Sequence, residues 1–266
     1  MKKIVLFDMD GTLTPPREKI DINVEQCLRE LQRQGFDIGI VTGSGMNYVR
    51  QQLSPMFDLS LADASRIHFL PCNGTKYILD DKTIYEMNMK DYMGSVLWHR
   101  LVSRLISYQN NMSMNYGTAL PLSGHFIDYR GSMINWCPIG REANQLQRKE
   151  WKELDAKDKV RHPALQELRD FISDCVNFIG DLSTSDIQIE AKLGGDTSFD
   201  IFPKGWDKTF CLKNFEDFEQ VYFIGDRCKP SGNDYEIFNH PRTISFETTS
   251  PANTIEIVNK ILSSDV

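Results

Sequence analysis

The stretch from Ile4 to Arg17 reads IVLFDMDGTLTPPR, and it decides the fold that we expect for this chain. Its apolar start is typical of a strand buried on both faces of a parallel sheet. Asp8 and Asp10 end that run, and a Gly-Thr turn follows. Residues i and i+2 of a strand point the same way, so these two carboxylates would repel each other without a cation beside them. A divalent, oxygen-ligated ion such as Mg²⁺ meets this need, and the alternative is an Asp-Gly turn with solvated carboxylates.

The composition of the 266 residues is that of a globular protein, with 41% hydrophobic residues, 25% charged residues and a net charge of −7. This acidic balance leaves no broad basic field, so we expect no nucleic-acid partner. No apolar stretch reaches about 18 residues, and the first apolar run is too short for a signal peptide, so we expect no membrane association. The six cysteines show no metal-ligand spacing, which favours reduced thiols and a cytoplasmic location.

Strands and helices alternate at both ends of the chain. The strands are predicted at residues 2–10, 37–45, 67–74, 220–226 and 241–246, and the helices at 23–35, 46–54 and 251–262. This order predicts an α/β fold with a doubly wound parallel sheet. Functional groups of such sheets gather at the carboxyl ends of the strands, where Asp8, Asp10, Thr42 and Ser44 are expected to lie.

The pattern changes in the middle of the chain. A long amphipathic helix is predicted at residues 95–112, a hairpin at 125–140, a charged stretch at 141–163, a further helix at 164–176 and two strands within 186–203. We therefore expect two domains: a core of residues 1–85 and 204–266, and an inserted α+β cap of residues 86–203 with an antiparallel sheet.

Four features occur in order along the expected core: an Asp-x-Asp-Gly-Thr motif, a hydroxyl-rich turn, a lysine after the insert and a second acidic motif. They are Asp8 to Thr12, Thr42 to Ser44, Lys208 in GWDK, and GDRCKPSGND with Asp226, Asn233 and Asp234. Together these features resemble the haloacid dehalogenase (HAD) superfamily of phosphotransferases. The resemblance implies a HAD-like core with an inserted cap.

The residue types suit phosphoryl transfer. Asp8 is expected to be the nucleophile that forms an aspartyl-phosphate, and Asp10 the acid/base that protonates the leaving oxygen. Lys208 is expected to neutralise phosphate charge together with Mg²⁺, and Thr42 or Ser44 to bind the phosphate. The alternatives are a metal-ligand role for Asp10, a surface lysine at Lys208 and a plain turn at Thr42 to Ser44.

Several blocks narrow the resemblance to eukaryotic-type α-phosphomannomutases. They read DGTLTPPR, FIDYRGSMINWCPIGR, EWKELDAKDKVR, GGDTSFDIFPKGWDKTFCL and GNDYEIF. The resemblance implies Mg²⁺ held by Asp8, Asp226 and the carbonyl of Asp10, a hexose-1,6-bisphosphate as activator and intermediate, and a homodimer through the caps. The substrate-binding positions that it implies are Arg17, Arg130, Arg141, Arg148, Ser198 and Asp200, and Asn233 of the second acidic motif is a further candidate.

Chemistry supports this assignment of the cap residues. A mutase must hold a sugar that carries phosphate at both ends, and arginine forks suit the phosphate far from the nucleophile. Ser198 and Asp200 lie two apart on one predicted strand, so they can face the hydroxyls of a sugar together. Surface arginines and a solvated sheet face are the alternatives.

Three functions are open at this point. The first is a hexose-phosphate mutase that moves phosphate between C6 and C1 of mannose, with glucose as a second substrate, and so feeds GDP-mannose synthesis. The second is a sugar phosphatase, in which water accepts the phosphoryl group. The third is a binding or scaffold protein, which would have no use for the charged set of Asp8, Asp10, Lys208 and Asp226. The cap arginines favour the mutase, because a phosphatase needs no grip on a second phosphate.

The chain also departs from the family pattern. Thr42 to Gly45 replaces Gly-Gly-Ser-Asp, Cys72 replaces the Glu of Glu-Asn-Gly, and Ser123-Gly124 stands where a further cap arginine is usual. His240 replaces an aspartate of a peripheral cation site. These departures bear on the sugar preference, the mutase efficiency and the second cation more than on phosphoryl transfer.

Overall fold

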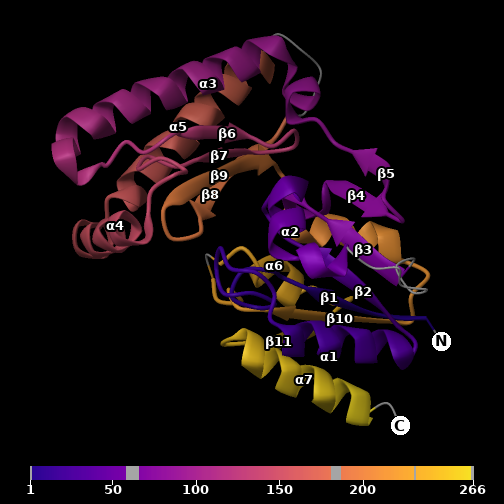
Figure 1. Cartoon of the computed structure of the whole chain (residues 1–266). Helices are drawn as coiled ribbons and strands as arrows, with labels where there is room; N and C mark the ends of the chain where they lie inside the picture. The colour runs from indigo at the N-terminus through magenta and orange to yellow at the C-terminus, as the bar shows by residue number, and fades with distance from the viewer. Residues whose placement is uncertain (1, 58–65, 181–186, 231, 265–266) are drawn as a thin grey trace. The chain divides into compact units, whose positions relative to one another are not determined.

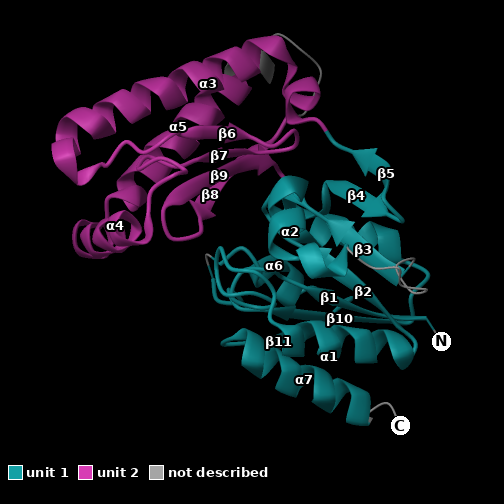
Figure 2. Cartoon of the chain, viewed as in Figure 1, with its two compact units in different colours: residues 1–87, 205–266 teal, residues 88–204 magenta. Residues whose placement is uncertain are grey.

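The computed structural model describes residues 2–57, 66–180, 187–230 and 232–264 (Figure 1). The chain divides into two compact units (Figure 2). Unit 1 consists of Met1–Met87 and Gly205–Val266, and unit 2 of Asn88–Lys204. No helix in the described ranges is long and apolar enough to cross a membrane.

Unit 1 contains a seven-stranded sheet with the order β11-β10-β1-β2-β3-β4-β5. Its strands are β1 (Lys3–Phe7), β2 (Phe36–Val41), β3 (Ile67–Leu70), β4 (Lys76–Leu79), β5 (Lys82–Glu86), β10 (Gln220–Gly225) and β11 (Ile244–Glu247). The strands from β11 to β3 are parallel, as the sequence predicts, whereas β4 and β5 extend the sheet as an antiparallel pair. The sheet is therefore mixed rather than wholly parallel. Neither of these two strands was predicted: β4 is only four residues long, and β5 is mostly exposed and lacks the apolar run of a buried strand.

Both faces of this sheet are covered by helices. Alternate residues of the central strand β1 point to opposite sides of the sheet, so they pack against different helices. Val5 and Phe7 pack with α1 (Ile22–Arg33), α2 (Met46–Gln52) and α7 (Pro251–Ser264). Ile4 and Leu6 pack on the other side with η5 (Lys208–Phe215) and α6 (Tyr235–Phe238). The apolar run that opens the chain thus forms the centre of two hydrophobic cores, as expected for a doubly wound sheet.

Unit 2 is an α+β unit with a four-stranded antiparallel sheet in the order β6-β7-β9-β8. Its elements are α3 (Met89–Tyr116), β6 (Ile127–Tyr129), β7 (Ile134–Trp136), α4 (Gln145–Asp158), α5 (Arg161–Gly180), β8 (Ile189–Gly194) and β9 (Ser198–Pro203). Helices α3 and α5 cover one face of this sheet (Figure 1). Trp136 and Phe199 stack beneath them, with ring centroids 4.6 Å apart.

Helix α4 occupies the charged stretch for which the sequence predicted no element. It begins with a capping box, in which Asn144 accepts from the backbone of Gln147 and the Gln147 side chain accepts from the backbone of Asn144. Of its side chains only Trp151 and Asp155 are buried, so the helical period of apolar residues is almost absent. Local capping and contacts with the rest of unit 2, rather than an apolar stripe, define this helix.

Candidate active site

The first group of candidate residues lies in unit 1, where β1 and β10 end side by side. Phe7 of β1 is in register with Ile224 of β10. The backbone N–H of Asp8 donates to the Ile224 carbonyl at 2.9 Å. Asp8 and Asp226 therefore leave neighbouring parallel strands at the same edge of the sheet, the edge at which such folds place their functional groups.

A third carboxylate, that of Asp234, completes an acidic cluster with Asp8 and Asp226. One oxygen of each residue lies within 4.8 Å of the others. Lys208 is fully buried, and its Nζ donates to Asp8 and, at 2.5 Å, to Oδ1 of Asp234. The other oxygen of Asp234 accepts from the backbone N–H of Arg227 at 3.0 Å. The sequence motif contained Asp234 without a role for it, and the structure shows that it holds Lys208 beside Asp8.

Burial and like charge raise the pKa values of two carboxyl groups in this cluster. Burial is the largest cause at Asp8, and with Asp234 and Asp226 nearby it raises the pKa of Asp8 to about 8, although Lys208 opposes the shift. Burial, followed by Asp234, also raises the pKa of Asp226. At Lys208 burial disfavours the charged ammonium, but Asp234 and Asp8 outweigh this effect and hold its pKa above the ordinary value. Full ionisation of the carboxylates therefore needs positive charge beyond that of Lys208.

The carboxylates of the cluster suit a hard divalent cation. Oδ1 of Asp226 is buried and accepts no hydrogen bond from the residues that the structure describes, and the same holds for Oδ1 of Asn233, which precedes Asp234 in the sequence. A buried oxygen without a partner is costly unless a cation or water satisfies it. Carboxylate and amide oxygens are the ligands that Mg²⁺ prefers, and the cluster contains no sulfur or imidazole. The residues present therefore fit Mg²⁺.

Two glycines allow the cluster to close up. Gly11 has a φ of +89°, and a Cβ at this position would lie against the Asp226 carboxylate. A Cβ at Gly225 would lie 2.7 Å from Oδ2 of Asp234. A side chain at either position would displace a carboxylate of the cluster, so the backbone approaches these groups only because glycine has no Cβ.

The side chain of Asp10 does not point in the same direction as that of Asp8, as was expected for residues i and i+2 of a strand. β1 ends at Phe7, so the alternation of a strand does not extend to Asp10. Its carboxylate lies outside the acidic cluster and accepts from the hydroxyl of Tyr48 at 2.8 Å. The structure thus groups the Asp8 side chain with Asp226 and Asp234 rather than with the side chain of Asp10. An acid/base role for Asp10, and a ligand role for its carbonyl, are not affected by this correction.

The expected phosphate-binding turn joins two loops at the same edge of the sheet. Oγ1 of Thr42 accepts from the backbone N–H of Ser44 at 3.1 Å. The carbonyls of Thr42 and Ser44 accept from the backbone N–H groups of Asn73 and Cys72, at 2.8 and 3.0 Å. The loops after β2 and β3 thus support each other, and Thr42 is buried while Ser44 is partly exposed.

The second group of candidate residues lies in unit 2, on the sheet face opposite to α3 and α5. Asn135 of β7 is in register with Asp200 of β9. Its Nδ2 donates to Asp200 at 2.6 Å and to Ser198 at 2.9 Å, while its Oδ1 accepts from Arg141 at 3.0 Å. One buried amide therefore joins three of the residues that the resemblance implied. The sequence analysis missed Asn135, because only the pairing of β7 with β9 brings it to them.

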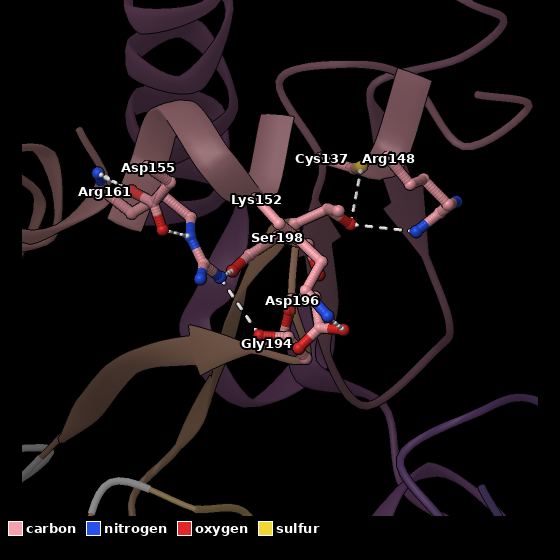
Figure 3. A network of polar contacts seen from close by, with 10 residues as sticks. Cys137, Arg148, Lys152, Asp155, Arg161, Gly194, Asp196 and Ser198 are labelled. Carbon is pink, nitrogen blue, oxygen red and sulfur yellow. Dashed lines mark hydrogen bonds and ion pairs between the residues drawn. The ribbon is translucent and has the colours of Figure 1, made fainter. Parts of the chain in front are cut away.

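The other two cap arginines are held by separate partners. Nε of Arg130 pairs with Asp128 at 2.8 Å, and Asp128 is in register with Asn135. Arg148, on α4, donates to Oγ1 of Thr197 at 3.1 Å (Figure 3), and it also donates to the carbonyl of Ala143. These ties order the guanidinium groups before any ligand binds, which lowers the entropy lost when an anion is bound.

The turn between β8 and β9 is held from α4 and α5 (Figure 3). Arg161, 8% exposed, pairs with the equally buried Asp155 at 2.8 Å and donates to the carbonyls of Gly195 and Ser198. Lys152 pairs with Asp196 at 2.9 Å. Arg161 therefore fixes the backbone that presents Thr197 and Ser198.

The remaining candidate residues lie in unit 1. Arg17 is exposed, and its backbone N–H donates to Tyr48 at 3.0 Å. His240, at the peripheral position near the C-terminus, accepts from the backbone N–H of Arg242 through Nδ1 at 3.2 Å.

Solved structures confirm the predicted fold class. The N-terminally truncated IMP-nucleotidase of Plasmodium falciparum matches with a TM-score of 0.60 and 14% identity, over 98% of this chain and 70% of that one. A trehalose-6-phosphate phosphatase related protein matches with a TM-score of 0.52 and 13% identity, over 99% of this chain and 98% of that one. The fold is HAD-like, as the order of the motifs predicted.

Sequence comparison is more specific. Residues 24–264 match the family described as eukaryotic phosphomannomutase. Phosphomannomutase of Drosophila melanogaster is 33% identical over 97% of this chain and 95% of its own length. Phosphomannomutase 1 of Homo sapiens is 33% identical over 97% of this chain and 91% of its own length. The chain belongs to the eukaryotic phosphomannomutase family, and the family predicted from the sequence blocks is confirmed.

Proposed function

We propose that this chain interconverts mannose-6-phosphate and mannose-1-phosphate through an aspartyl-phosphate on Asp8. The observation that carries the proposal is the buried Asp8–Lys208–Asp234 arrangement beside Asp226, in a chain of this family. A carboxylate next to a fixed ammonium group is prepared to attack a phosphoryl group, because the ammonium stabilises the charge of the transferred oxygens.

In the first half-reaction an oxygen of Asp8 attacks the phosphorus of a hexose-1,6-bisphosphate. The bond between phosphorus and the sugar oxygen breaks as the bond to Asp8 forms. Asp10 gives its proton to the leaving sugar oxygen, so a hexose monophosphate and the aspartyl-phosphate result. Lys208 neutralises phosphoryl charge throughout, and the backbone and hydroxyl groups around Thr42 and Ser44 bind the phosphoryl oxygens.

In the second half-reaction the other hydroxyl of a hexose monophosphate accepts the phosphoryl group. Asp10, now a carboxylate, removes the proton of that hydroxyl as its oxygen attacks the phosphorus. The bond between phosphorus and Asp8 breaks, which restores the Asp8 carboxylate and yields a hexose-1,6-bisphosphate. Transfer of either the 1-phosphoryl or the 6-phosphoryl group of this bisphosphate back to Asp8 then determines which hexose monophosphate is formed.

Mg²⁺ would be held by Asp8, Asp226 and the carbonyl of Asp10. Asn233, which directly precedes Asp234 in the sequence, is not needed as a ligand. When bound, it supplies positive charge that neutralises the phosphoryl oxygens and permits the carboxylates to ionise. The raised pKa of Asp8 and the unpartnered oxygen of Asp226 support this assignment.

Unit 2 supplies the binding groups for the rest of the sugar phosphate. Arg141 and Arg148, with Arg130, bind the phosphate that does not react, and Arg17 of unit 1 contributes a further charge. Ser198 and Asp200 bind sugar hydroxyls. The network around Asn135 supports these roles, since it ties Arg141, Ser198 and Asp200 into one polar face.

The cellular setting follows from the same proposal. Mannose-1-phosphate would feed GDP-mannose synthesis, and glucose phosphates would be second substrates. The six free cysteines support a reducing, cytoplasmic compartment. A homodimer through unit 2 is proposed from the family resemblance, and the exposed apolar side chains of Val96, Ile106 and Met114 on α3 support an interface there.

The deciding experiment is one incubation with mannose-1-phosphate, Mg²⁺ and a trace of hexose-1,6-bisphosphate, followed by phosphorus NMR. We expect mannose-6-phosphate to accumulate without stoichiometric release of inorganic phosphate. The same incubation with glucose-1-phosphate measures sugar preference, and Asp8→Asn is the blank. Inorganic phosphate as the sole product would instead make the chain a sugar phosphatase.

A further inference from the structure

A tyrosine of α2 contacts the carboxylate that the reaction uses as acid and base. The hydroxyl of Tyr48 donates to Oδ1 of Asp10 at 2.8 Å and accepts from the backbone N–H of Arg17 at 3.0 Å. The same N–H lies 3.4 Å from Oδ1 of Asp10. Tyr48 therefore joins the first and last residues of the loop from Asp10 to Arg17, which the sequence analysis treated as two separate functional positions.

The direction of these hydrogen bonds is determined by chemistry. A phenol has one proton, and a backbone N–H can only donate, so the proton of Tyr48 must point to Asp10. Burial, followed by the charge of Asp10, raises the pKa of Tyr48, so the phenol stays protonated at neutral pH. Its ring packs against the hydrophobic core formed by β1, β2 and α1, which restricts its movement. Tyr48 is thus a fixed donor and not itself a base.

The second oxygen of Asp10 is left for chemistry. Oδ2 accepts no hydrogen bond from any residue within the described ranges, and Asp10 is only partly buried. A carboxyl group held at one oxygen can rotate little, so the direction of its other oxygen is set by the donor.

We propose that Tyr48 is a positioning residue for the acid/base Asp10: it binds Oδ1 and thereby directs Oδ2 to the sugar oxygen that leaves or attacks. This inference rests on the proposed function only in the role of Asp10, and it holds for a mutase and for a phosphatase alike. The same hydroxyl also holds the backbone of Arg17, from which the exposed arginine side chain extends.

The proposal has a consequence that a purely structural role does not share. When Asp8 attacks a phosphate ester, the bond between phosphorus and the leaving oxygen breaks, and a sugar alkoxide must take a proton from Asp10. A p-nitrophenolate leaving group is stable without that proton. Loss of Tyr48 should therefore slow the transfer from a sugar ester and leave the transfer from p-nitrophenyl phosphate nearly unchanged.

The test compares the wild type with Tyr48→Phe on a hexose-1,6-bisphosphate and on p-nitrophenyl phosphate, in the full chain with Mg²⁺. For the sugar ester, trapping of the aspartyl-phosphate in a rapid-quench experiment reports the first step regardless of the acceptor. We expect this step to fall about ten- to a hundredfold, the range for one hydrogen bond to a charged group. Release of p-nitrophenol in the first turnover, measured by stopped flow, should change less than about threefold, because that leaving group does not need a proton from Asp10.

Tyr222→Phe is the matched control, since its hydroxyl donates to Gln220 within β10, before the functional end of that strand. It should affect neither substrate. Equal losses of Tyr48→Phe on both substrates would overturn the proposal and reduce Tyr48 to a packing residue. No loss on either would overturn it as well. Turnover of p-nitrophenyl phosphate by the variant shows in the same sample that it has folded, and the isomerisation assay of the wild type tests the mutase function separately.

Discussion

Asp8 is the residue on which the proposed chemistry depends. Asp8→Asn removes the nucleophile but keeps the shape of the side chain, so turnover should fall by about four orders of magnitude or more while the fold survives. Initial rates of isomerisation and circular dichroism measure the two effects. Asp217→Asn, an exposed aspartate that pairs with Lys2, is the control and should keep full activity. A tenth of the wild-type kcat in Asp8→Asn would exclude Asp8 as nucleophile.

The arginines of unit 2 separate a mutase from a phosphatase. Arg141→Ala and Arg148→Ala each remove a charged fork, so kcat/KM for mannose-1-phosphate should fall about ten- to a hundredfold, from ~1.5–3 kcal/mol of lost binding. A small phosphate ester has no distal phosphate and should change less than about threefold. Lys157→Ala, an exposed lysine on α4, serves as the control. If both substrates lose equally, the arginines support the unit's structure rather than bind the ligand.

At the scale of elements, the β8–β9 turn depends on α4 and α5. Arg161→Met leaves the Asp155 carboxylate buried without its partner, so the free energy of unfolding should drop by about 3–5 kcal/mol. The pair of substitutions Arg161→Met and Asp155→Leu removes both charges and should recover a large part of that loss. Lys152→Ala breaks the exposed pair with Asp196 and should cost less than about 1 kcal/mol. Urea unfolding of all three variants measures the differences, and similar values for Arg161→Met and Lys152→Ala would contradict the role of the buried pair.

At the scale of the whole molecule, the acidic cluster couples stability to pH and to Mg²⁺. The pKa of Asp8 rises from 3.8 to about 8 on folding, so between these values the folded chain binds more protons than the unfolded chain. Stability supplied by this group is therefore present below about pH 4 and is lost as the pH rises towards 8. Other groups titrate as well, so the difference between the wild type and Asp8→Asn isolates the effect.

In EDTA, the Tm of Asp8→Asn minus the Tm of the wild type should increase as the pH rises from 5 to 8. The amide carries no charge at any pH, so it does not repel Asp226 and Asp234. Mg²⁺ should raise the Tm of the wild type most at pH 8 and reverse the order of the two proteins. The same chelation should abolish activity, and added Mg²⁺ should restore it. A wild-type Tm that is independent of Mg²⁺ at pH 8, or full activity in exhaustively chelated buffer, would argue against a cation at the cluster.

The sequence by itself determined the HAD-like class, the family and most core elements. Strands such as β1 and β10 are local runs of apolar residues, and the motifs at their ends carry Asp8 and Asp226 within a few residues of a strand. Such features need no long-range information, because hydrophobic period and turn chemistry act over short distances. Helix α4 and the exposed strand β5, which lack that period, were not predicted, and neither was the four-residue strand β4.

Only the tertiary structure decided which side chains meet. Asp234 and Lys208 are 26 residues apart, Tyr48 and Asp10 are 38 apart, and Asn135 and Ser198 are 63 apart. No local pattern encodes these pairs, because each forms where a strand end, a helix or a sheet register brings distant backbone together. Asp10 shows the same limit over two residues: the strand stops at Phe7, and a hydroxyl from α2 rather than the strand alternation sets the direction of its carboxylate. Residue types follow from chemistry that the sequence carries, whereas their partners follow from packing.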